Sequence, residues 1–318
     1  MTVVASVVVC TLNRGALLEK CLVSLLEQSL LRERYEIIVV DNGSTDSTPE
    51  VVARYAATSA IVALHEPVVG LSRARNRGWQ TARGQYICYI DDDAVAARGW
   101  LEHAVWAFEN VSPQPDWVAG PVELDWESPA PEWINDDLAV PLGRIDWGKV
   151  PRRLTVEEFF VGANSCFPKR CLELHGGFDE RLGRQGANLL SGEETQLKQR
   201  IEAAGGFLYY HPEVRVRHFV PTERTLPAWF YRRYFWGGVS DFFMRRTLMG
   251  TSLGTAVSTP DTEGRTGRLM RNLVCSLGFG VTRTQAIHAR IYLAYVAGWL
   301  SGVCRWHNAL EGFRLHAA

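Results

Sequence analysis

The sequence lacks the spaced cysteine pairs of a small zinc domain and the glycine-rich signatures of two large nucleotide-binding classes. Its seven cysteines are odd in number and scattered, and none form a Cys-x-x-Cys pair. A zinc ribbon and a disulfide framework are therefore disfavoured, and a reducing compartment is favoured. Neither Gly-x-Gly-x-x-Gly nor the Walker A pattern occurs, so a Rossmann dehydrogenase and a P-loop kinase have no support.

A membrane-spanning segment and a signal peptide are also not expected. The uncharged segment 291–304 has 14 residues. As a helix it would span about 21 Å, which is short of the ~30 Å of a hydrocarbon core. Met1 leads directly into a Val-rich segment rather than a basic one followed by an apolar helix, so we expect no signal peptide and a cytoplasmic protein.

Lysine is absent from the last third of the chain. Residues 215–318 hold 14 Arg and 5 acidic residues, whereas residues 1–214 hold 20 basic and 30 acidic residues. The formal net charge of −1 therefore conceals a basic, aromatic-rich C-terminal region. This asymmetry predicts contact with an anionic partner, either a membrane or a nucleic acid.

What the chain does contain is a regular alternation of strand and helix patterns in its first half. Short β-branched runs predict strands, and the helical spacing of apolar residues predicts helices between them. This alternation indicates an α/β fold with a mostly parallel central sheet flanked by helices. The expected strands are 6–10, 35–40, 61–64 and 86–90, and the expected helices are 16–26, 49–55 and 70–82.

Regularity declines beyond residue 98. Residues 125–157 are dense in Trp, Pro and Asp and are expected to form long ordered loops, while residues 253–267 are typical of a linker or mobile loop. The remaining expected elements are helices at 98–110 and 193–204 and strands at 118–124, 161–167, 207–210 and 213–220.

Three consecutive carboxylates, Asp91, Asp92 and Asp93, directly follow the fourth expected strand. Parallel α/β sheets bind ligands at the carboxyl ends of their strands. Clustered carboxylates repel one another unless they share a cation, and their hard oxygen ligands favour Mg²⁺ or Mn²⁺. The alternative is a solvated acidic turn of the kind that is common on loops.

Polar residues at two other places fit a nucleotide ligand. Asp41 ends the second strand, where its carboxylate can accept hydrogen bonds from a base or ribose, although the residues after it also offer helix caps. In the helix at 70–82, Arg73 and Arg77 share a face and Arg75 points elsewhere. Cations beside an acidic metal loop suit a phosphate-bearing ligand, and the alternative is surface arginine.

Glu193 and Glu194 open the helix expected at 193–204. A carboxylate at a loop–helix junction is well placed to act as a general base. The alternative for Glu194 is a capping box with Ser191. His218, in the last expected strand, is either a third metal ligand or a structural histidine.

Taken in order, these motifs resemble those of family-2 glycosyltransferases of the GT-A fold. The resemblance covers roughly residues 3–220, and its specificity lies in the order of the series rather than in any one motif. It implies a nucleoside-diphosphate sugar donor, a divalent metal and inversion at the anomeric carbon. The motifs are Thr11–Arg14, Val40–Thr48, Gly70–Gly78, Tyr89–Asp93, Gly162–Asn164, Gly176–Asp179 and Gly192–Glu194.

The resemblance also implies roles for individual residues. Glu194 stands at the position of the family's catalytic base, which is usually Asp, and Glu193 would assist it by positioning or by a hydrogen bond to the acceptor. The metal, Mg²⁺ or Mn²⁺, would be held by Asp93, Asp91 and His218. The donor would contact Thr11, Asn13, Arg14, Asp41, Gly70, Arg75, Asp91, Asp92 and Asn164.

The expected organisation is a GT-A domain at 1–222 followed by an Arg- and aromatic-rich helical region at 223–318. Within the domain, residues 1–97 would bind the nucleotide sugar and residues 98–222 the acceptor, which would be a glycan, a lipid-linked molecule or a small molecule. Residues 224–305 would contact an anionic membrane surface peripherally. The alternative is that they pack on the core or on a second copy of the chain.

Two other functions remain open at this point. A sugar-phosphate nucleotidyltransferase would share the sheet and the acidic loop, but its Gly-rich phosphate loop after the first strand is missing. A nucleic-acid-binding protein would explain the basic aromatic tail but not the carboxylates, so we expect no nucleic-acid partner.

Overall fold

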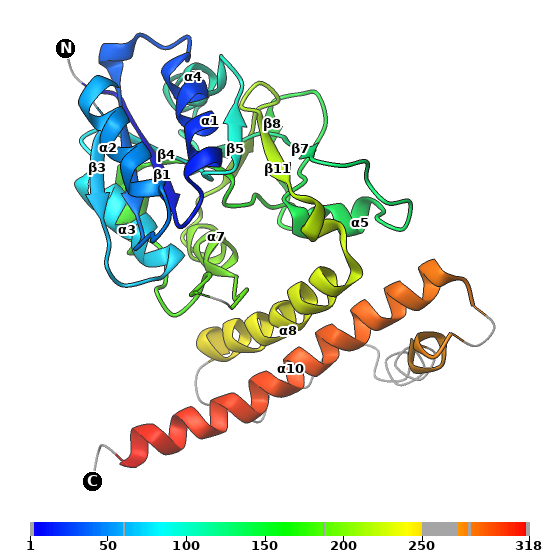
Figure 1. Ribbon diagram of the computed structural model, residues 1–318. Coiled ribbons are helices and arrows are strands. Elements are labelled where there is room, and N and C mark those ends of the chain that lie inside the picture. Colours follow the sequence, from blue (N-terminus) through cyan, green and yellow to red (C-terminus); the bar gives the residue numbers. More distant parts are fainter. Residues whose placement is uncertain (1–2, 60, 187, 250–271, 279–280, 316–318) are drawn as a thin grey trace. The chain divides into compact units, whose positions relative to one another are not determined.

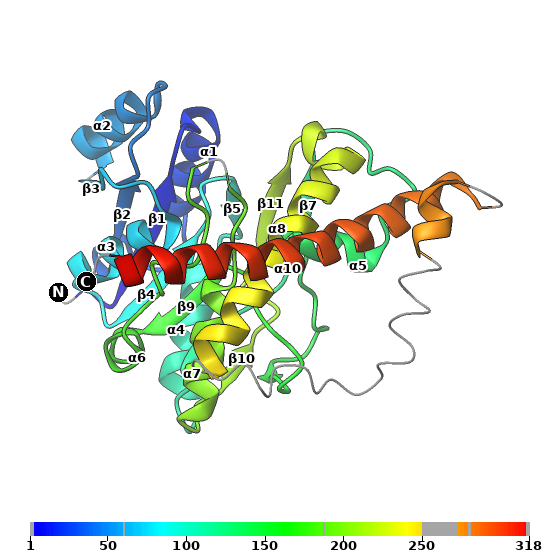
Figure 2. The ribbon, with the colours of Figure 1, turned by 90° about the horizontal axis from the view of Figure 1, so that it is seen from below.

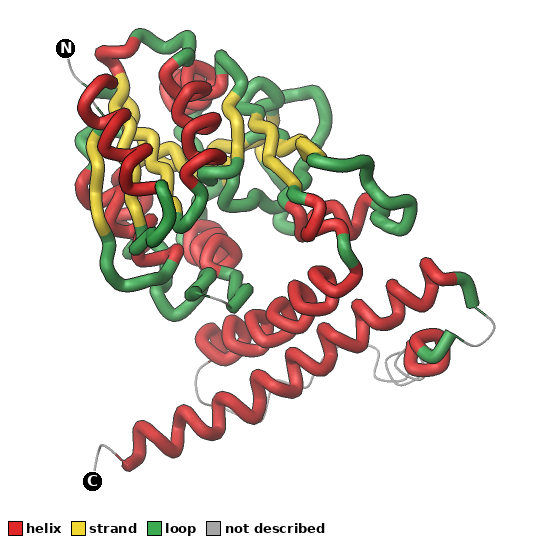
Figure 3. The backbone as a smooth tube through the Cα atoms, in the orientation of Figure 1, coloured by secondary structure: helices red, strands yellow, loops and turns green. Residues whose placement is uncertain are grey.

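The computed structural model describes residues 3–59, 61–186, 188–249, 272–278 and 281–315. The chain forms two compact units. The first consists of Met1–Ser128, Asp136–Gly186 and Glu193–Val220, and the second of Pro129–Asn135, Ala187–Gly192 and Pro221–Ala318. The strands belong to the first unit, and the described elements of the second are helical (Figure 3).

An eight-stranded, mostly parallel sheet forms the centre of the first unit (Figure 1). The order across the sheet is β3 (Val62–His65), β2 (Tyr35–Asp41), β1 (Ala5–Thr11), β4 (Tyr86–Ile90), β9 (Asn164–Pro168), β6 (Trp117–Ala119), β10 (Leu208–Tyr210) and β8 (Arg152–Arg153). The neighbouring strands β3, β2, β1 and β4 all run parallel. Strand β9 runs antiparallel to both β4 and β6, and the edge strand β8 runs antiparallel to β10.

The first strands of the sheet are continuous apolar runs because both of their faces are buried. Val7, Val8 and Val9 of β1 are fully buried, as a strand must be when helices cover both faces of its sheet. The helices of the unit are α1 (Gly15–Leu26), α2 (Thr48–Ser59), α3 (Leu71–Thr81), α4 (Trp100–Asn110), α5 (Asp136–Ala139), α6 (Lys169–His175) and α7 (Glu193–Ala203), with 3₁₀ turns η1 (Arg32–Arg34) and η2 (Val140–Leu142).

A second, three-stranded sheet has the order β5 (Ala94–Ala96), β11 (Val216–Val220) and β7 (Val122–Trp126). The strand expected at 118–124 is therefore two strands in different sheets, because the chain breaks its pairing at Gly120. A side chain at Gly120 would overlap the carbonyl oxygens of Val214 and His211, so the backbone itself packs there. The loops expected at 125–157 contain the end of β7 and the short elements α5, η2 and β8. The linker expected at 253–267 lies outside the described residues.

The second unit is built on two long helices that lie side by side, α8 (Pro227–Met249) and α10 (Arg283–Leu315), preceded by η3 (Thr222–Thr225) (Figures 1 and 2). Glycines let their backbones meet. A side chain at Gly238 would overlap the carbonyl oxygen of Tyr295, and one at Gly298 would overlap that of Phe235. Among the described residues, no helix combines the length and apolar character needed to cross a membrane.

Candidate active site

The carboxyl ends of β1, β2 and β4 bring the predicted donor residues to one edge of the sheet. Thr11 and Asp41 are direct register partners at the ends of β1 and β2. Asp91 follows β4 immediately, and β4 pairs with β1 in parallel. Because parallel strands end at the same edge, residues far apart in the sequence meet there.

The second sheet brings His218 to the same acidic loop. β5 follows the loop directly, and its Ala94 pairs with His218 of β11. The backbone N–H of Phe219 donates to the carbonyl of Asp93 at 2.8 Å. Backbone hydrogen bonding between β11 and the chain at Asp93 and Ala94 thus places His218 beside the acidic loop.

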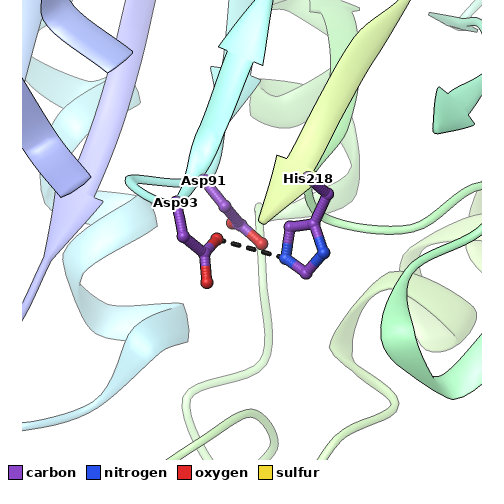
Figure 4. Close-up of side chains that lie close together, drawn as sticks. All are labelled: Asp91, Asp93 and His218. Carbon is purple, nitrogen blue, oxygen red and sulfur yellow. Dashed lines mark ion pairs between the residues drawn. The ribbon is translucent and has the colours of Figure 1, made fainter. Parts of the chain in front are cut away.

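Asp91, Asp93 and His218 form a group that could hold a metal ion (Figure 4). One ligand atom from each lies within 4.8 Å of the others. His218 Nε2 is 3.1 Å from Asp93 Oδ1, and both side chains are buried. Two carboxylates and an imidazole offer oxygen and nitrogen ligands that suit Mn²⁺, and the carboxylates also suit Mg²⁺. The donor set therefore fits the predicted divalent cation.

Arg14 and Thr11 hold the neighbouring carboxylate, Asp92. Thr11 Oγ1 donates to Asp92 at 2.8 Å, and one nitrogen of Arg14 donates to Asp92 at 2.8 Å and to Asp93 at 2.7 Å. Burial raises the pKa of Asp92 to about 6, although Arg14 acts in the opposite direction. Thr11 and Asp92 thus form part of the scaffold, whereas Arg14 stays 29% exposed and within reach of a ligand.

Polar side chains fix the loops that follow β1 and β2. Asn13 Oδ1 accepts the N–H of Thr45 at 2.7 Å, and Asp41 Oδ1 accepts the N–H of Ser44 at 3.0 Å. Asn42, which sequence reasoning did not single out, accepts the N–H of Gly70 at 2.8 Å. The turn before α3 is thereby fixed beside the end of β2.

Arg75 connects the metal group with the two glutamates of α7. Its side chain is only 3% exposed, and it lies 3.0 Å from Glu194 Oε1, 3.1 Å from Glu193 Oε1 and 3.5 Å from Asp91 Oδ1. Burial opposes its charge, but Glu194, Glu193 and Asp91 outweigh that cost and raise the pKa of Arg75. Predicted as a donor contact, Arg75 is a buried bridge between carboxylates.

An aromatic ring and a glycine pack closely around the Arg75 side chain. The guanidinium lies over the ring of Phe178, 5.3 Å from its centroid. A side chain at Gly162 would overlap both Arg75 and Glu194, which explains the glycine in the predicted motif at 162–164. Because Glu194 pairs with Arg75, its side chain has a different partner from the one that a capping box with Ser191 requires.

The two adjacent glutamates differ in their environments. The Glu193 side chain is 3% exposed and that of Glu194 is 18% exposed. Burial, reinforced by the nearby Glu194, raises the pKa of Glu193 to about 8. Glu194 is therefore the more accessible of the two carboxyl groups.

Glu193 is expected to make the protein less stable as pH rises. A carboxyl group whose pKa is raised on folding favours the folded state in its protonated form, so its contribution is full below the unfolded pKa near 4.5 and is lost as pH rises through about 8. Urea unfolding of the wild type and Glu193→Gln at several pH values measures this. The Gln variant should show a smaller loss of stability from pH 5 to 8, and an equal or larger loss would contradict the assignment.

Asn164, which was predicted as a donor contact, has a structural role in the fold. Its Oδ1 accepts the indole N–H of Trp100 at 2.9 Å, and its amide donates to the carbonyls of Val214 at 2.7 Å and Gly120 at 3.3 Å. The side chain is buried and joins β9 to α4 and to the turns that precede β7 and β11. The prediction followed motif order, which does not reveal that these groups surround the residue.

Comparison with known proteins places this site in a family. Residues 6–138 match the family described as Glycosyl transferase family 2. The glucosyl-dolichyl phosphate glucuronosyltransferase of Haloferax volcanii is 30% identical over 240 residues, which cover 74% of this chain and 75% of that protein. The succinoglycan biosynthesis protein ExoM of Rhizobium meliloti is 28% identical over 235 residues, covering 72% and 71%.

Solved structures share the fold at lower identity. The mannosyltransferase PcManGT from Pyrobaculum calidifontis, in complex with GDP-Man and Mn²⁺, aligns with a TM-score of 0.62 at 21% identity and covers 95% of this chain and 88% of its own. S. aureus TarS 1-349, in complex with UDP-GlcNAc, aligns with a TM-score of 0.56 at 16% identity, covering 94% and 79%.

The mostly parallel α/β sheet is a fold shared with these structures, and together with the family match it defines a glycosyltransferase of the GT-A type. The chain belongs to glycosyltransferase family 2. The predicted α/β fold, its C-terminal helices and the enzyme class are thereby confirmed, and the nucleotidyltransferase and nucleic-acid-binding alternatives receive no support.

Proposed function

We propose that this glycosyltransferase is metal-dependent and inverting, and that it transfers a sugar from a nucleoside-diphosphate sugar to a hydroxyl of a glycan, lipid-linked or small-molecule acceptor. The observation that carries the proposal is the bridge formed by Arg75. It joins Asp91 of the metal group to Glu194, a partly exposed carboxylate. A residue of the proposed cation site and a candidate base thus both lie within 3.5 Å of one buried arginine.

The donor would bind along the edge formed by the first two strands. Asp41 would accept hydrogen bonds from the base or ribose, and the exposed part of Arg14 would face the phosphates. Two structural neighbours carry GDP-Man and UDP-GlcNAc in their complexes, which supports a nucleotide sugar as the class of donor.

Asp93, Asp91 and His218 would hold Mg²⁺ or Mn²⁺. When bound, the ion would neutralise the charge that develops on the departing diphosphate. Arg75, fixed against Asp91, would keep that carboxylate oriented toward the ion. The complex of PcManGT with Mn²⁺ supports this assignment.

Glu194 would remove the proton from the acceptor hydroxyl as its oxygen attacks the anomeric carbon. The new carbon–oxygen bond forms while the bond to the diphosphate breaks, and the diphosphate leaves with the bonding electrons. A single in-line displacement inverts configuration and needs only one base. The partial exposure of Glu194 and its contact with Arg75 at 3.0 Å support its role as an oriented base.

The experiment that tests the proposed function is a donor panel. The protein is incubated with UDP-, GDP- and dTDP-sugars and Mn²⁺, with and without lipid-linked acceptors, and released nucleoside diphosphate is measured. We expect release from one nucleotide class and its loss on chelation. Pyrophosphate in place of nucleoside diphosphate would indicate a nucleotidyltransferase instead, and release that is unaffected by chelator would contradict metal dependence.

Asp41→Ala is expected to weaken nucleotide binding more than it slows the chemical step. Hydrogen bonds to a charged group contribute about 1.5–3 kcal/mol, so donor affinity should fall roughly ten- to a hundredfold. Isothermal titration with the nucleoside diphosphate measures it. Unchanged affinity would show that Asp41 serves only the loop, through the N–H of Ser44.

The C-terminal region is expected to bind anionic bilayers weakly and reversibly. It is rich in arginine, and its described part exposes the apolar side chains of Leu273, Val274, Leu277 and Leu300. Basic and apolar groups together suit a membrane interface. A dolichyl-linked substrate in the name of the Haloferax relative would make such binding useful.

Co-sedimentation with anionic vesicles measures the binding of the protein to the bilayer. Binding should fall as salt rises, since charges are screened within about 8 Å at physiological ionic strength. The pair Leu273→Ser and Leu277→Ser should weaken binding, and Leu31→Ser is the control because Leu31 is equally exposed but belongs to the first unit. Equal binding to neutral vesicles at every salt concentration would contradict the electrostatic component.

A further inference from the structure

Helix α8 holds the four residues that lead into the base-bearing helix α7. Ser240 of α8 accepts the backbone N–H of Ser191 at 2.9 Å. Arg233, two turns earlier on α8, donates to the carbonyl of Leu189 and to the hydroxyl of Ser191, each at 3.2 Å. The Ser240 hydroxyl itself donates to the carbonyl of Trp236 at 2.8 Å, so it is oriented to accept. These bonds fix the backbone at residues 189–191.

Gly192 completes the attachment. Its φ of +107° lies in the region that favours glycine. A side chain there would overlap Met244, which lies one turn beyond Ser240 on the same face of α8. Close contact and backbone conformation therefore both require glycine at the residue immediately before Glu193.

Helix α8 is in turn braced by α10. Besides the glycine contacts between the two backbones, the Tyr295 hydroxyl donates to Asp241 at 2.7 Å. Asp241 directly follows Ser240 in the chain. The helix that holds the segment is thus fixed by a second helix of the same unit.

We infer that Arg233, Ser240 and Met244 are positioning residues for glycosyl transfer, because they hold residues 189–192, which lead directly into Glu193 and Glu194. This inference rests on the proposed function. Glu194 lies only two residues beyond Gly192, and it must keep its 3.0 Å contact with Arg75 while facing the acceptor. A displacement of about 1 Å can lower a rate roughly a hundredfold. The C-terminal region would then be needed for turnover and not only for attachment to a membrane.

The test compares Gly192→Ala and Ser240→Ala with Gly237→Ala. Gly237 lies on the same helix, but a side chain there meets nothing within 4 Å, so it controls for changes in α8 itself. We expect kcat to fall roughly a hundredfold for Gly192→Ala and less for Ser240→Ala, with unchanged donor affinity. Gly237→Ala should behave as the wild type. Arg233→Lys, which keeps a donor, should be more active than Arg233→Met, which has none.

Hydrogen exchange of the full chain gives a readout that does not depend on the reaction. The amide of Ser191, which donates to Ser240, and the amides in the second turn of α7 should exchange faster in Gly192→Ala and Ser240→Ala, while those in β1 and β4 stay protected. Faster exchange with normal kcat would overturn the inference, as would a kcat loss that is matched by weaker donor binding or by general loss of protection. Failure of the proposed function is recognised separately, by normal turnover of Glu194→Gln.

Discussion

Glu194→Gln is expected to lower turnover by roughly 10²–10⁴-fold, because an amide cannot accept the proton of the acceptor hydroxyl. The fold and donor affinity should barely change, since Gln has the same shape and its oxygen can still accept a hydrogen bond from Arg75. Rates of nucleoside diphosphate release in the presence of acceptor, together with thermal melting, measure both effects.

Two further variants make this result specific. Glu194→Asp restores the residue that the family usually carries, with a shorter reach, and should keep partial activity. Glu193→Gln should matter less, because Glu193 is the more buried of the two and its pKa is raised to about 8. Normal turnover of Glu194→Gln with an inactive Glu193→Gln would move the base to Glu193. Activity in both variants would contradict the single-displacement mechanism.

Asp93→Ala is expected to abolish turnover while the fold stays intact. The substitution removes the carboxylate that lies closest to His218 and that would share the divalent cation with Asp91. It also removes one partner of Arg14, which keeps Asp92. Nucleoside diphosphate release with Mn²⁺ present and circular dichroism measure the two outcomes.

Glu123→Ala is the matched control, because Glu123 is an exposed acidic residue of β7 whose register partner Arg217 points to the opposite face of the second sheet from His218. It should retain wild-type activity. Full activity of Asp93→Ala in excess chelator would show that the acidic group has no part in the reaction.

The fold and the metal group could be predicted because they depend on local patterns. Buried strands such as 6–10 and 86–90 are continuous apolar runs, and a parallel sheet places the residues after them at one edge. Asp91, Asp93 and His218 were expected together and lie together. The order of motifs was sufficient for this even though His218 lies on a different sheet.

The roles of Arg75 and Asn164 could not be predicted from the sequence. The carboxylate partners of Arg75 lie 118 and 119 residues away, and no local pattern indicates that an arginine on a helix will be buried between them. Asn164 belongs to a predicted motif, but its amide is enclosed by groups from α4 and from two turns. Contacts of this kind arise only when the sheets have packed.

The attachment of residues 189–191 to α8 was missed for the same reason. Ser191 was predicted as a helix cap from its position alone, whereas its N–H donates to Ser240, 49 residues later. The glycine before Glu193 was the only signal, since a required glycine often marks a close backbone contact.

Binding of Mn²⁺ together with a nucleoside diphosphate tests the central claim most directly, because it isolates the metal site from the chemistry. Electron paramagnetic resonance of free Mn²⁺, titrated with protein in the presence of UDP or GDP, measures it. The wild type and Glu194→Gln should bind Mn²⁺ equally, His218→Ala should bind it more weakly, and Asp93→Ala should not bind it. Binding by Asp93→Ala equal to that of the wild type would contradict a metal-dependent transferase built on this site.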